Sequence, residues 1–487
     1  MTALRTLGVH FLHFFSGTFA QMLVGLVSFP IFTRILSTED YGTMSLISVF
    51  VSVAVAVAKG GLSDGIIRFY GEYADTGRLP TFTSTVVFRG LVLVCIVTAL
   101  YVAMSANLDD LLGIPEAATA AFLVMAGVLF VRPMNVIVFN FLRATGRTFF
   151  YNTMMVGLRL TSVVLGVALL LFFNRQIAAN FVGIVLAEVL FGLVLWRWFA
   201  KSYSVSPKQV SGQLAWTLMA FGLPLLATEL GYLLLLYTDR YILAMFHGPA
   251  TLGVYTVGYS LPQYISDLVL FSVSYSIVPI YTELYARKGR AETQAFLGSA
   301  LKYYVMGILP LIAGYTAVCR DAVVFLASDK YASAAEFSPI IVMGLAFLGM
   351  NYILYAGLYL EKRSKLILVS MAVALAVNIV MSLLLVPRHG SWGASTAMLI
   401  ACASSSLMTA ILSFRFLPIK LPYAALLKYG LASAAMWWLL GMIETGSPLG
   451  NLAVKIPAGA AFMGAVMFAL DRQLVREALK LVRSRKA

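Results

Sequence analysis

Long apolar runs, separated by short polar stretches, set the pattern of this chain of 487 residues. A helix needs roughly 20 apolar residues to cross about 30 Å of hydrocarbon. The runs are continuously apolar and do not alternate, which favours helices over the strands of a membrane barrel. We therefore expect an all-α polytopic membrane protein with about fourteen transmembrane helices, near residues 8–31, 42–62, 83–106, 117–141, 151–173, 177–199, 214–237, 250–276, 297–319, 337–360, 366–386, 391–414, 423–443 and 452–470.

A short motif occurs twice along the chain. Phe32-Thr33-Arg34-Ile35-Leu36 leads to Tyr41-Gly42, and Tyr237-Thr238-Asp239-Arg240-Tyr241-Ile242-Leu243 leads to Leu252-Gly253-Val254-Tyr255. Related halves in a membrane chain are typical of transporters whose site lies between the halves. The repeat therefore predicts two related halves in this chain.

Composition and charge placement sharpen this picture. The chain is 61% hydrophobic and only 11% charged, which excludes a soluble domain. The net charge of +14 does not indicate nucleic acid, because 25 of the 35 Lys and Arg residues fall on one side when alternate loops are assigned to opposite sides. That bias predicts that the N- and C-termini are both cytoplasmic. The basic tail 471–487 has helical apolar spacing and is expected to lie on anionic lipid; a solvated tail is the alternative.

Several chemical signatures are missing from the sequence. It has no Gly-x-x-x-x-Gly-Lys-Ser/Thr phosphate loop and no His-Glu-x-x-His metal motif. The four histidines are dispersed, and the three cysteines lack metal or disulfide spacing. Because the loops expected outside are also short, a membrane enzyme of lipid-linked sugar metabolism is a weaker interpretation than a transporter. We expect no resident metal or cofactor.

Charged residues within the apolar runs are the first candidates for function. A charge at the bilayer centre costs about 2.5–3.5 kcal/mol on insertion scales, so it usually faces a cavity or a partner. The basic candidates for substrate binding are Lys59, Arg132 and Arg159, and the acidic candidates for ion coupling are Glu188, Glu229 and Asp267. Two alternatives stay open: Lys59 and Arg132 snorkel to the interface, and Arg159 pairs structurally with Glu188.

Uncharged polar residues add a face to several of the expected helices. His13 and Gln21 share one in the first run, Gln263 and Asp267 share another, and Asn351 and Tyr355 are four residues apart. We expect these faces to converge on a water-filled cavity, with helix packing as the alternative. Cations in that cavity predict an anionic substrate group such as a diphosphate, while amides and aromatic rings suit sugars.

Motifs in a fixed order resemble one known family over about residues 1–415. They are Gly25 and Phe29-Pro30-Ile31-Phe32-Thr33-Arg34 through Gly42, Gly61-Leu62-Ser63 with Ile66-Ile67-Arg68-Phe69, Leu142-Arg143-Ala144-Thr145-Gly146-Arg147, Phe221-Gly222-Leu223-Pro224, Asp239-Arg240-Tyr241, Gly253-Val254-Tyr255, and Asn378 with Pro387 and Gly390 through Ala394. This pattern is similar to that of bacterial polysaccharide biosynthesis proteins, which are lipid-linked oligosaccharide flippases of the O-antigen and exopolysaccharide type. The family belongs to the superfamily of multidrug extrusion proteins and lipid II flippases.

The resemblance implies a function and a mechanism. A flippase of this family moves an undecaprenyl-diphosphate-linked oligosaccharide to the outer leaflet by alternating access, coupled to H⁺, Na⁺ or the membrane potential. It implies two pseudo-symmetric six-helix lobes around a central cavity, 1–200 and 214–415, joined by a cytoplasmic linker at 201–213 and followed by two added helices within 416–470. It also implies a lateral portal between the first and eighth helices for the lipid tail. Cavity arginines hold the diphosphate in related flippases, and Lys59 is the nearest counterpart here. The matched loop residues Arg34, Arg240, Arg68 and Arg143 are the gate candidates.

The implied partners are a lipid-linked oligosaccharide, membrane lipids and glycan polymerase or assembly proteins, with no nucleic acid, and we expect a monomer. The rival interpretation is a proton- or sodium-coupled multidrug exporter. Such an exporter would take mostly cationic substrates and would need a mainly acidic cavity, whereas the three basic candidates favour an anionic one.

Overall fold

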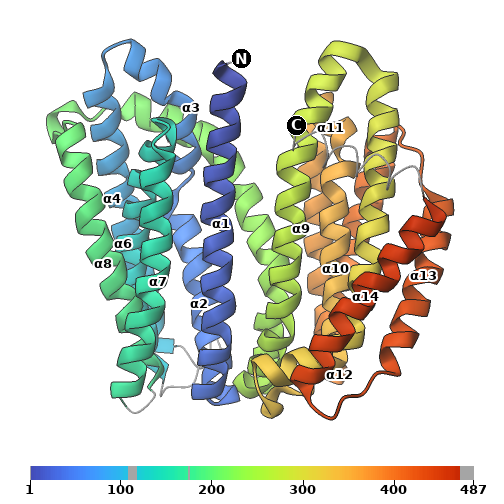
Figure 1. Ribbon diagram of the computed structural model, residues 1–487. Coiled ribbons are helices and arrows are strands. Elements are labelled where there is room, and N and C mark those ends of the chain that lie inside the picture. The colour runs from blue at the N-terminus through green and yellow to red at the C-terminus, as the bar shows by residue number, and fades with distance from the viewer. Residues whose placement is uncertain (1, 108–117, 174–175, 472–487) are drawn as a thin grey trace. The chain divides into compact units, whose positions relative to one another are not determined.

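Helices make up all of the regular structure in the described part of the chain, as expected for an all-α protein (Figure 1). The computed structural model describes residues 2–107, 118–173 and 176–471, without the side chains of 2–16, 18, 268–276 and 364. The longer helices are α1 (Thr2–Ile35), α2 (Thr38–Lys59), α3 (Leu62–Asp75), α4 (Leu79–Met104), α6 (Thr119–Ala144), α7 (Thr148–Phe172), α8 (Ile177–Ser202), α9 (Gly212–Leu326), α10 (Ala334–Leu354), α12 (Ser364–Phe414), α13 (Tyr423–Gly441) and α14 (Pro448–Leu470). A short helix, α11 (Ala356–Leu360), follows α10, and three 3-10 turns lie at Ser105–Asn107, Pro207–Gln209 and Asp329–Tyr331.

Two of these helices are interrupted by glycines in unusual conformations. In α9, Gly248 and Gly289 have φ angles of 76° and 79°, and in α12 Gly390 has φ 53° and ψ −128°. Glycine adopts such angles without the Cβ clash of other residues, so the chain reverses there. These breaks divide α9 into three segments and α12 into two. Among the described residues, ten helices are long and apolar enough to cross a membrane, and dividing the long ones at these breaks brings the number of spans close to the predicted fourteen.

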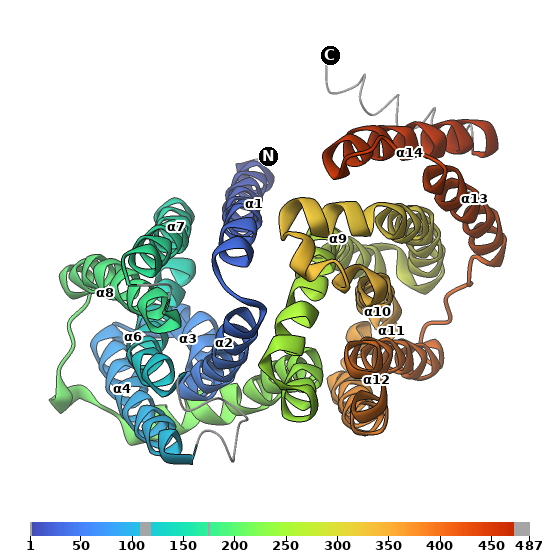
Figure 2. The ribbon, with the colours of Figure 1, turned by 90° about the horizontal axis from the view of Figure 1, so that it is seen from below.

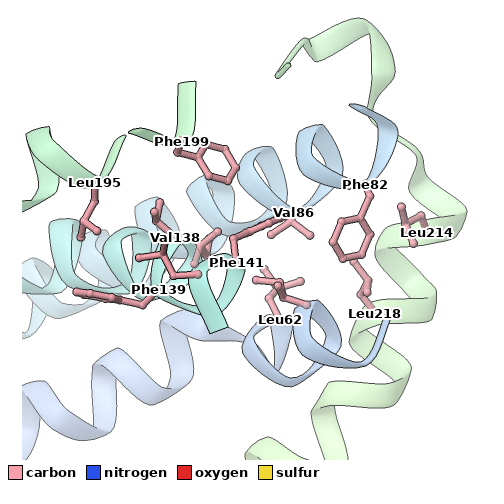
Figure 3. Packing of buried hydrophobic residues seen from close by; sticks show 13 residues of the cluster. Leu62, Phe82, Val86, Val138, Phe139, Phe141, Leu195, Phe199, Leu214 and Leu218 are labelled. Carbon is pink, nitrogen blue, oxygen red and sulfur yellow. The ribbon is translucent and has the colours of Figure 1, made fainter. Parts of the chain in front are cut away.

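The chain folds into two compact units, and the lobes 1–200 and 214–415 stay a prediction. One unit comprises residues 1–256 and 386–390, and the other comprises 257–385 and 391–487. The first segment of α9, predicted to open the second lobe at 214, therefore packs with the first unit. Its Leu214 and Leu218 are buried against Phe82 of α4 in one apolar cluster (Figure 3). The backbone of Gly222 also meets that of Gly61, a contact that apolar periodicity does not reveal.

The core of the first unit is built around α6. This helix packs against α2, α3, α4 and α8, while α7 packs against α8 and α1 (Figure 2). The apolar cluster at one end of α6 combines aliphatic side chains with aromatic rings, and Phe141 is edge-on to Phe199 at a ring separation of 5.0 Å. Edge-to-face aromatic pairs contribute about 0.5–1.5 kcal/mol beyond their buried area. The cluster thus gives this unit a rigid end against which α3 and α9 are positioned.

The segment predicted as a linker, 201–213, is fastened to α4 by three consecutive hydroxyl side chains. Thr83 Oγ1 donates to the carbonyl oxygen of Ser204 at 2.8 Å. The backbone N–H groups of Ser206 and Ser211 donate to Ser84 Oγ and Thr85 Oγ1, each at 3.0 Å. The three hydroxyls are fully buried, so these bonds replace water for linker groups that have no helical partner. The linker is therefore a fixed part of the first unit.

In the second unit, α13 and α14 are tied to α9 by ionic contacts at both ends. Lys455 Nζ lies 3.1 Å from an Asp321 carboxylate oxygen, and Asn451 donates to the other oxygen at 2.9 Å. At the opposite end of α14, Asp471 accepts from the Tyr429 hydroxyl and from Lys428, whose Nζ is 2.9 Å away. The Tyr429 and Lys428 hydrogen bonds, with Lys302 nearby, hold the pKa of Asp471 below its ordinary value. The predicted amphipathic tail beyond 471 lies outside the described residues.

Candidate functional site

A salt bridge between α2 and the first segment of α9 joins two of the predicted candidates. Lys59 Nζ lies 2.5 Å from Glu229 Oε1, and their side chains are 18% and 39% exposed. Lys59 is the last residue of α2, where a cation is favoured by the helix dipole. Both residues lie within apolar helices of membrane-spanning length, so each neutralises a charge that would otherwise be costly. The two residues are 170 positions apart in the sequence, so the pattern of neighbouring residues could not predict that they pair.

A backbone contact between two glycines positions this salt bridge. Gly60 and Gly61 follow Lys59 in the left-handed conformation, with φ angles of 53° and 72°, and end α2. A Cβ atom on Gly61 would lie 2.3 Å from the carbonyl carbon of Gly222, so the two backbones touch without room for a side chain. Glu229 follows Gly222 by two helical turns and therefore lies on the same face of α9. The glycines bring the two helices close enough for the charges to meet.

Two further charged residues lie around the salt bridge. The Asp64 carboxylate, in the first turn of α3, interacts electrostatically with Glu229, Lys59 and Arg143. Sequence reasoning missed Asp64, although an acidic residue three positions after a double glycine was an available signal.

Residues 61–65 also match the Gly-x-Ser-x-Gly pattern of serine hydrolases, but they lie where one helix, α2, has ended and the next, α3, begins. The strand-to-helix turn that such a nucleophile needs is therefore missing from this segment.

Arg132 and Glu188 form a second salt bridge, inside the core of the first unit. Arg132 Nε of α6 lies 2.5 Å from Glu188 Oε1 of α8. The Glu188 side chain is only 2% exposed, and Asn135 donates to its other carboxylate oxygen at 3.1 Å and to its carbonyl at 3.0 Å. The sequence suggested Arg159 as a partner for Glu188, but the partners found are Arg132 and Asn135. Arg159 itself is exposed on α7.

The remaining polar candidates are distributed over both units. In the second unit, Gln263 donates to Asp267 at 2.6 Å within α9, and Asn351 donates to Ser405 Oγ at 3.3 Å. The ring of Tyr355 lies 5.7 Å from that of Tyr352. In the first unit, Gln21 is half-buried on α1, and the His13 side chain lies outside the described residues. Their predicted convergence on one cavity stays a prediction.

The gate candidates lie at helix ends and in short connections. Arg34 is exposed in the last turn of α1, and Arg240 packs over the Tyr237 ring at 5.1 Å. Arg68 of α3 lies over Phe69 at 5.4 Å, and Arg143 Nη1 is 3.5 Å from Asn140 Oδ1.

Beside Arg240, sequence reasoning missed a buried polar pair in the second copy of the repeated motif. Asp239 is fully buried and accepts a hydrogen bond from the Tyr255 hydroxyl. Its other carboxylate oxygen accepts from the backbone N–H of Arg240 at 2.8 Å. Both residues belong to the motif, so the repeat itself was the signal that could have found them.

Comparison with solved structures shows a fold shared with known transporters. A lipid II flippase MurJ in an inward closed conformation matches with a TM-score of 0.77 at 16% identity, over 95% of this chain and 99% of the other. An inward-facing multidrug resistance MATE family transporter of the MOP superfamily matches with a TM-score of 0.67 at 15% identity, over 81% and 94%. A mutant of the Vibrio cholerae MATE transporter VcmN matches with a TM-score of 0.58 at 17% identity, over 84% and 98%.

Comparison of the sequence itself gives the family. A search of curated proteins finds no match. The sequence profile of the polysaccharide biosynthesis proteins, in contrast, matches residues 10–285, which is more than half of the chain and includes both copies of the repeated motif and the Lys59–Glu229 salt bridge. This multi-span membrane chain belongs to the polysaccharide biosynthesis protein family.

Proposed function

We propose that this protein is a flippase that moves an undecaprenyl-diphosphate-linked oligosaccharide from the cytoplasmic to the outer leaflet of a bacterial inner membrane. The family membership and the fold shared with flippases and exporters support a transporter. The observation that carries the proposal is the intramembrane salt bridge between Lys59 and Glu229. In this salt bridge Lys59 is a cation within an apolar helix, and an anionic substrate can replace its counter-ion, Glu229.

The proposed step is an exchange of partners at Lys59. An unpaired charge is expensive in an apolar span, so Lys59 needs a carboxylate or another anion at every stage. A substrate diphosphate that approaches Lys59 takes the place of Glu229. Glu229, once released, is partly exposed and is the candidate to take up a proton or Na⁺ and so to couple transport to an ion gradient. The Glu188 carboxylate suits this role less, because it is buried with two fixed partners.

The orientation and partners follow from the same proposal. The Lys/Arg bias places the Lys59 end of α2 and both termini on the cytoplasmic side, where the substrate is made. Arg132 and Arg159 are secondary candidates for the diphosphate, and polar side chains are candidates for the sugars: His13, Gln21, Gln263, Asn351 and Tyr355. Asp267 is the remaining candidate for ion coupling. The partners we propose are the lipid-linked oligosaccharide, membrane lipids and a glycan polymerase.

Surface glycan in cells that carry substituted protein tests the proposal. Lys59→Met and Glu229→Gln should each reduce surface glycan at least tenfold at equal protein level in the membrane. The matched control is Glu283→Gln with Arg287→Gln, which removes an exposed salt bridge of 3.1 Å and should leave glycan unchanged. The charge swap Lys59→Glu with Glu229→Lys should restore the amount of folded protein but not transport. Full recovery of glycan in the swap would show that the salt bridge is only structural.

A further inference from the structure

The two copies of the repeated motif meet each other in the first unit through their glycines. A Cβ atom on Gly42 of α2 would lie 1.8 Å from the carbonyl oxygen of Pro249 and 2.8 Å from the backbone nitrogen of Gly253. A Cβ atom on Gly253 of α9 would lie 1.9 Å from the carbonyl oxygen of Thr38. Pro249 and Thr38 each precede the glycine of their own copy by four residues. The contact is therefore reciprocal, as a local two-fold relation between the copies requires.

A pair of hydroxyl groups extends this reciprocal contact by one helical turn. Ser45 follows Gly42 by three residues, and Thr256 follows Gly253 by three residues. Thr256 Oγ1 donates to Ser45 Oγ at 3.1 Å, and both side chains are buried. On each helix the contact residues lie four positions before and three positions after the glycine. Small residues at such spacing let the backbones approach closely, as in other membrane helix pairs. We call residues 38–45 of α2 and 249–256 of α9, taken together, the glycine crossing.

We propose that the glycine crossing is the outer gate of the transport cycle, closed in this structure and opened to release substrate. The inference rests on the proposed function, whose orientation places the Thr38 end of α2 on the outer side. Three properties suit a gate. The contact joins the two halves of an internal repeat, and it excludes any side chain between the backbones. Glu39 and Asp40 lie in the same segment of α2, but none of the salt bridges among the described residues crosses the contact. Its backbone groups stay within their own helices, so the crossing can separate without exposing unpaired donors.

A reversible cross-link tests the gate directly. Ser45→Cys with Thr256→Cys, in a chain whose native Cys95, Cys319 and Cys402 are replaced by Ala, should form a disulfide on oxidation. Surface glycan should fall at least tenfold when the disulfide forms and recover after reduction. The matched control is Ser370→Cys with Thr409→Cys, which replaces a buried hydroxyl pair at 3.2 Å within α12. That disulfide should leave glycan unchanged.

Labelling from outside the cell tests the gate independently of the proposed function. A third substitution, Ser52→Cys, lies on α2 between Ser45 and Lys59, about two helical turns beyond Ser45. The reduced thiols at positions 45 and 256 also react with maleimide, so labelling is measured by mass spectrometry on the peptide that carries position 52. A membrane-impermeant maleimide should label that position in reduced protein and at least fivefold more slowly once the crossing is locked. If locking blocks labelling while the Lys59 variants leave glycan unchanged, the gate holds and the proposed function fails. Labelling that is absent in reduced protein, or unaffected by the disulfide, would contradict the gate, as would failure of the disulfide across the crossing to form.

Glycine substitution gives an independent readout. Gly253→Ala should force the crossing apart and increase outside labelling of Ser52→Cys at least threefold in the protein that reaches the membrane. Gly307→Ala is the control, because a Cβ atom on this helical glycine meets nothing within 4 Å. Equal labelling of the two variants would overturn the assignment of the glycine crossing as a gate.

Discussion

The two ends of α2 are closed by different chemistry. At the Lys59 end, a backbone contact between Gly61 and Gly222 is accompanied by a salt bridge. At the Thr38 end, a backbone contact between Gly42 and Gly253 is accompanied by a hydrogen-bonded hydroxyl pair. Both ends use glycine for close approach, so the difference lies in the salt bridge. A salt bridge can be opened by an anion that competes for its cation, which is why the proposed function places substrate recognition at the Lys59 end.

The largest expected effect comes from filling the backbone contact at the Lys59 end. Gly61→Ala places a Cβ atom about 2.3 Å from the Gly222 backbone in a residue with φ 72°, so both a clash and backbone strain arise. We expect a loss of stability of about 3 kcal/mol or more, from strain and overpacking together. The measurement is the thermal midpoint of the purified protein in detergent. Gly77→Ala is the control, since Gly77 has φ 70° with nothing within 4 Å, and equal losses would show that strain alone matters.

Removing one partner of the salt bridge should have the next largest effect. Lys59→Met leaves Glu229 without its counter-ion, and we expect a loss of about 1–3 kcal/mol, below the full cost of a buried ion because Glu229 is partly exposed. The double variant Lys59→Met with Glu229→Met should recover at least half of that stability while transport stays lost. Denaturation of the three proteins measures the coupling. Strictly additive losses would argue against a direct interaction.

At the Thr38 end, removal of the hydroxyl pair should have a small effect. Ser45→Ala deletes one bond between helices, and such bonds average about 0.6 kcal/mol in membrane proteins. We expect the thermal midpoint to fall only slightly and surface glycan to stay near its usual level. A loss of stability as large as that caused by Lys59→Met would show that the two ends of α2 do not differ in the way described.

The smallest expected effect concerns Asp471, whose contribution to stability should depend on pH. The pKa of Asp471 is lowered by Tyr429 and Lys428, so its carboxylate contributes stability above the unfolded value of about 3.9 and loses it as pH falls through the lower folded value. We expect Asp471→Asn to lower stability by about 0.5 kcal/mol at pH 7. The difference from the unsubstituted protein should stay constant between pH 8 and 5 and shrink below pH 4. A difference that grows as pH falls would contradict the sign of the shift.

The sequence predicted the helices well because each apolar run carries its own signal. The runs, the all-α class and the family resemblance are confirmed. The packing of Leu214 and Gly222 could not be predicted, because it depends on contacts with Phe82 and Gly61, far away in sequence. Apolar periodicity shows which face of a helix is buried but not which helix covers it.

Charge pairing was the least predictable feature for the same reason. The sequence placed cations in the first half and most carboxylates in the second, and it offered Arg159 for Glu188. Glu188 instead bonds Arg132, because α6 and α8 are neighbours in the core of the first unit. Glu229 meets Lys59 because the glycine contact draws the first segment of α9 against α2. The ion-coupling and sugar-binding roles stay predictions.

The most direct test of the account is flipping by purified protein in vesicles. Protein is reconstituted with a fluorescent undecaprenyl-diphosphate-linked oligosaccharide, and a membrane-impermeant quencher measures how fast the glycan changes leaflet. The account predicts flipping with the unsubstituted chain and with the control that lacks the Glu283–Arg287 salt bridge, and a rate at least tenfold lower with Lys59→Met. Equal rates in all three proteins would contradict the assignment of Lys59 as the group that holds the diphosphate.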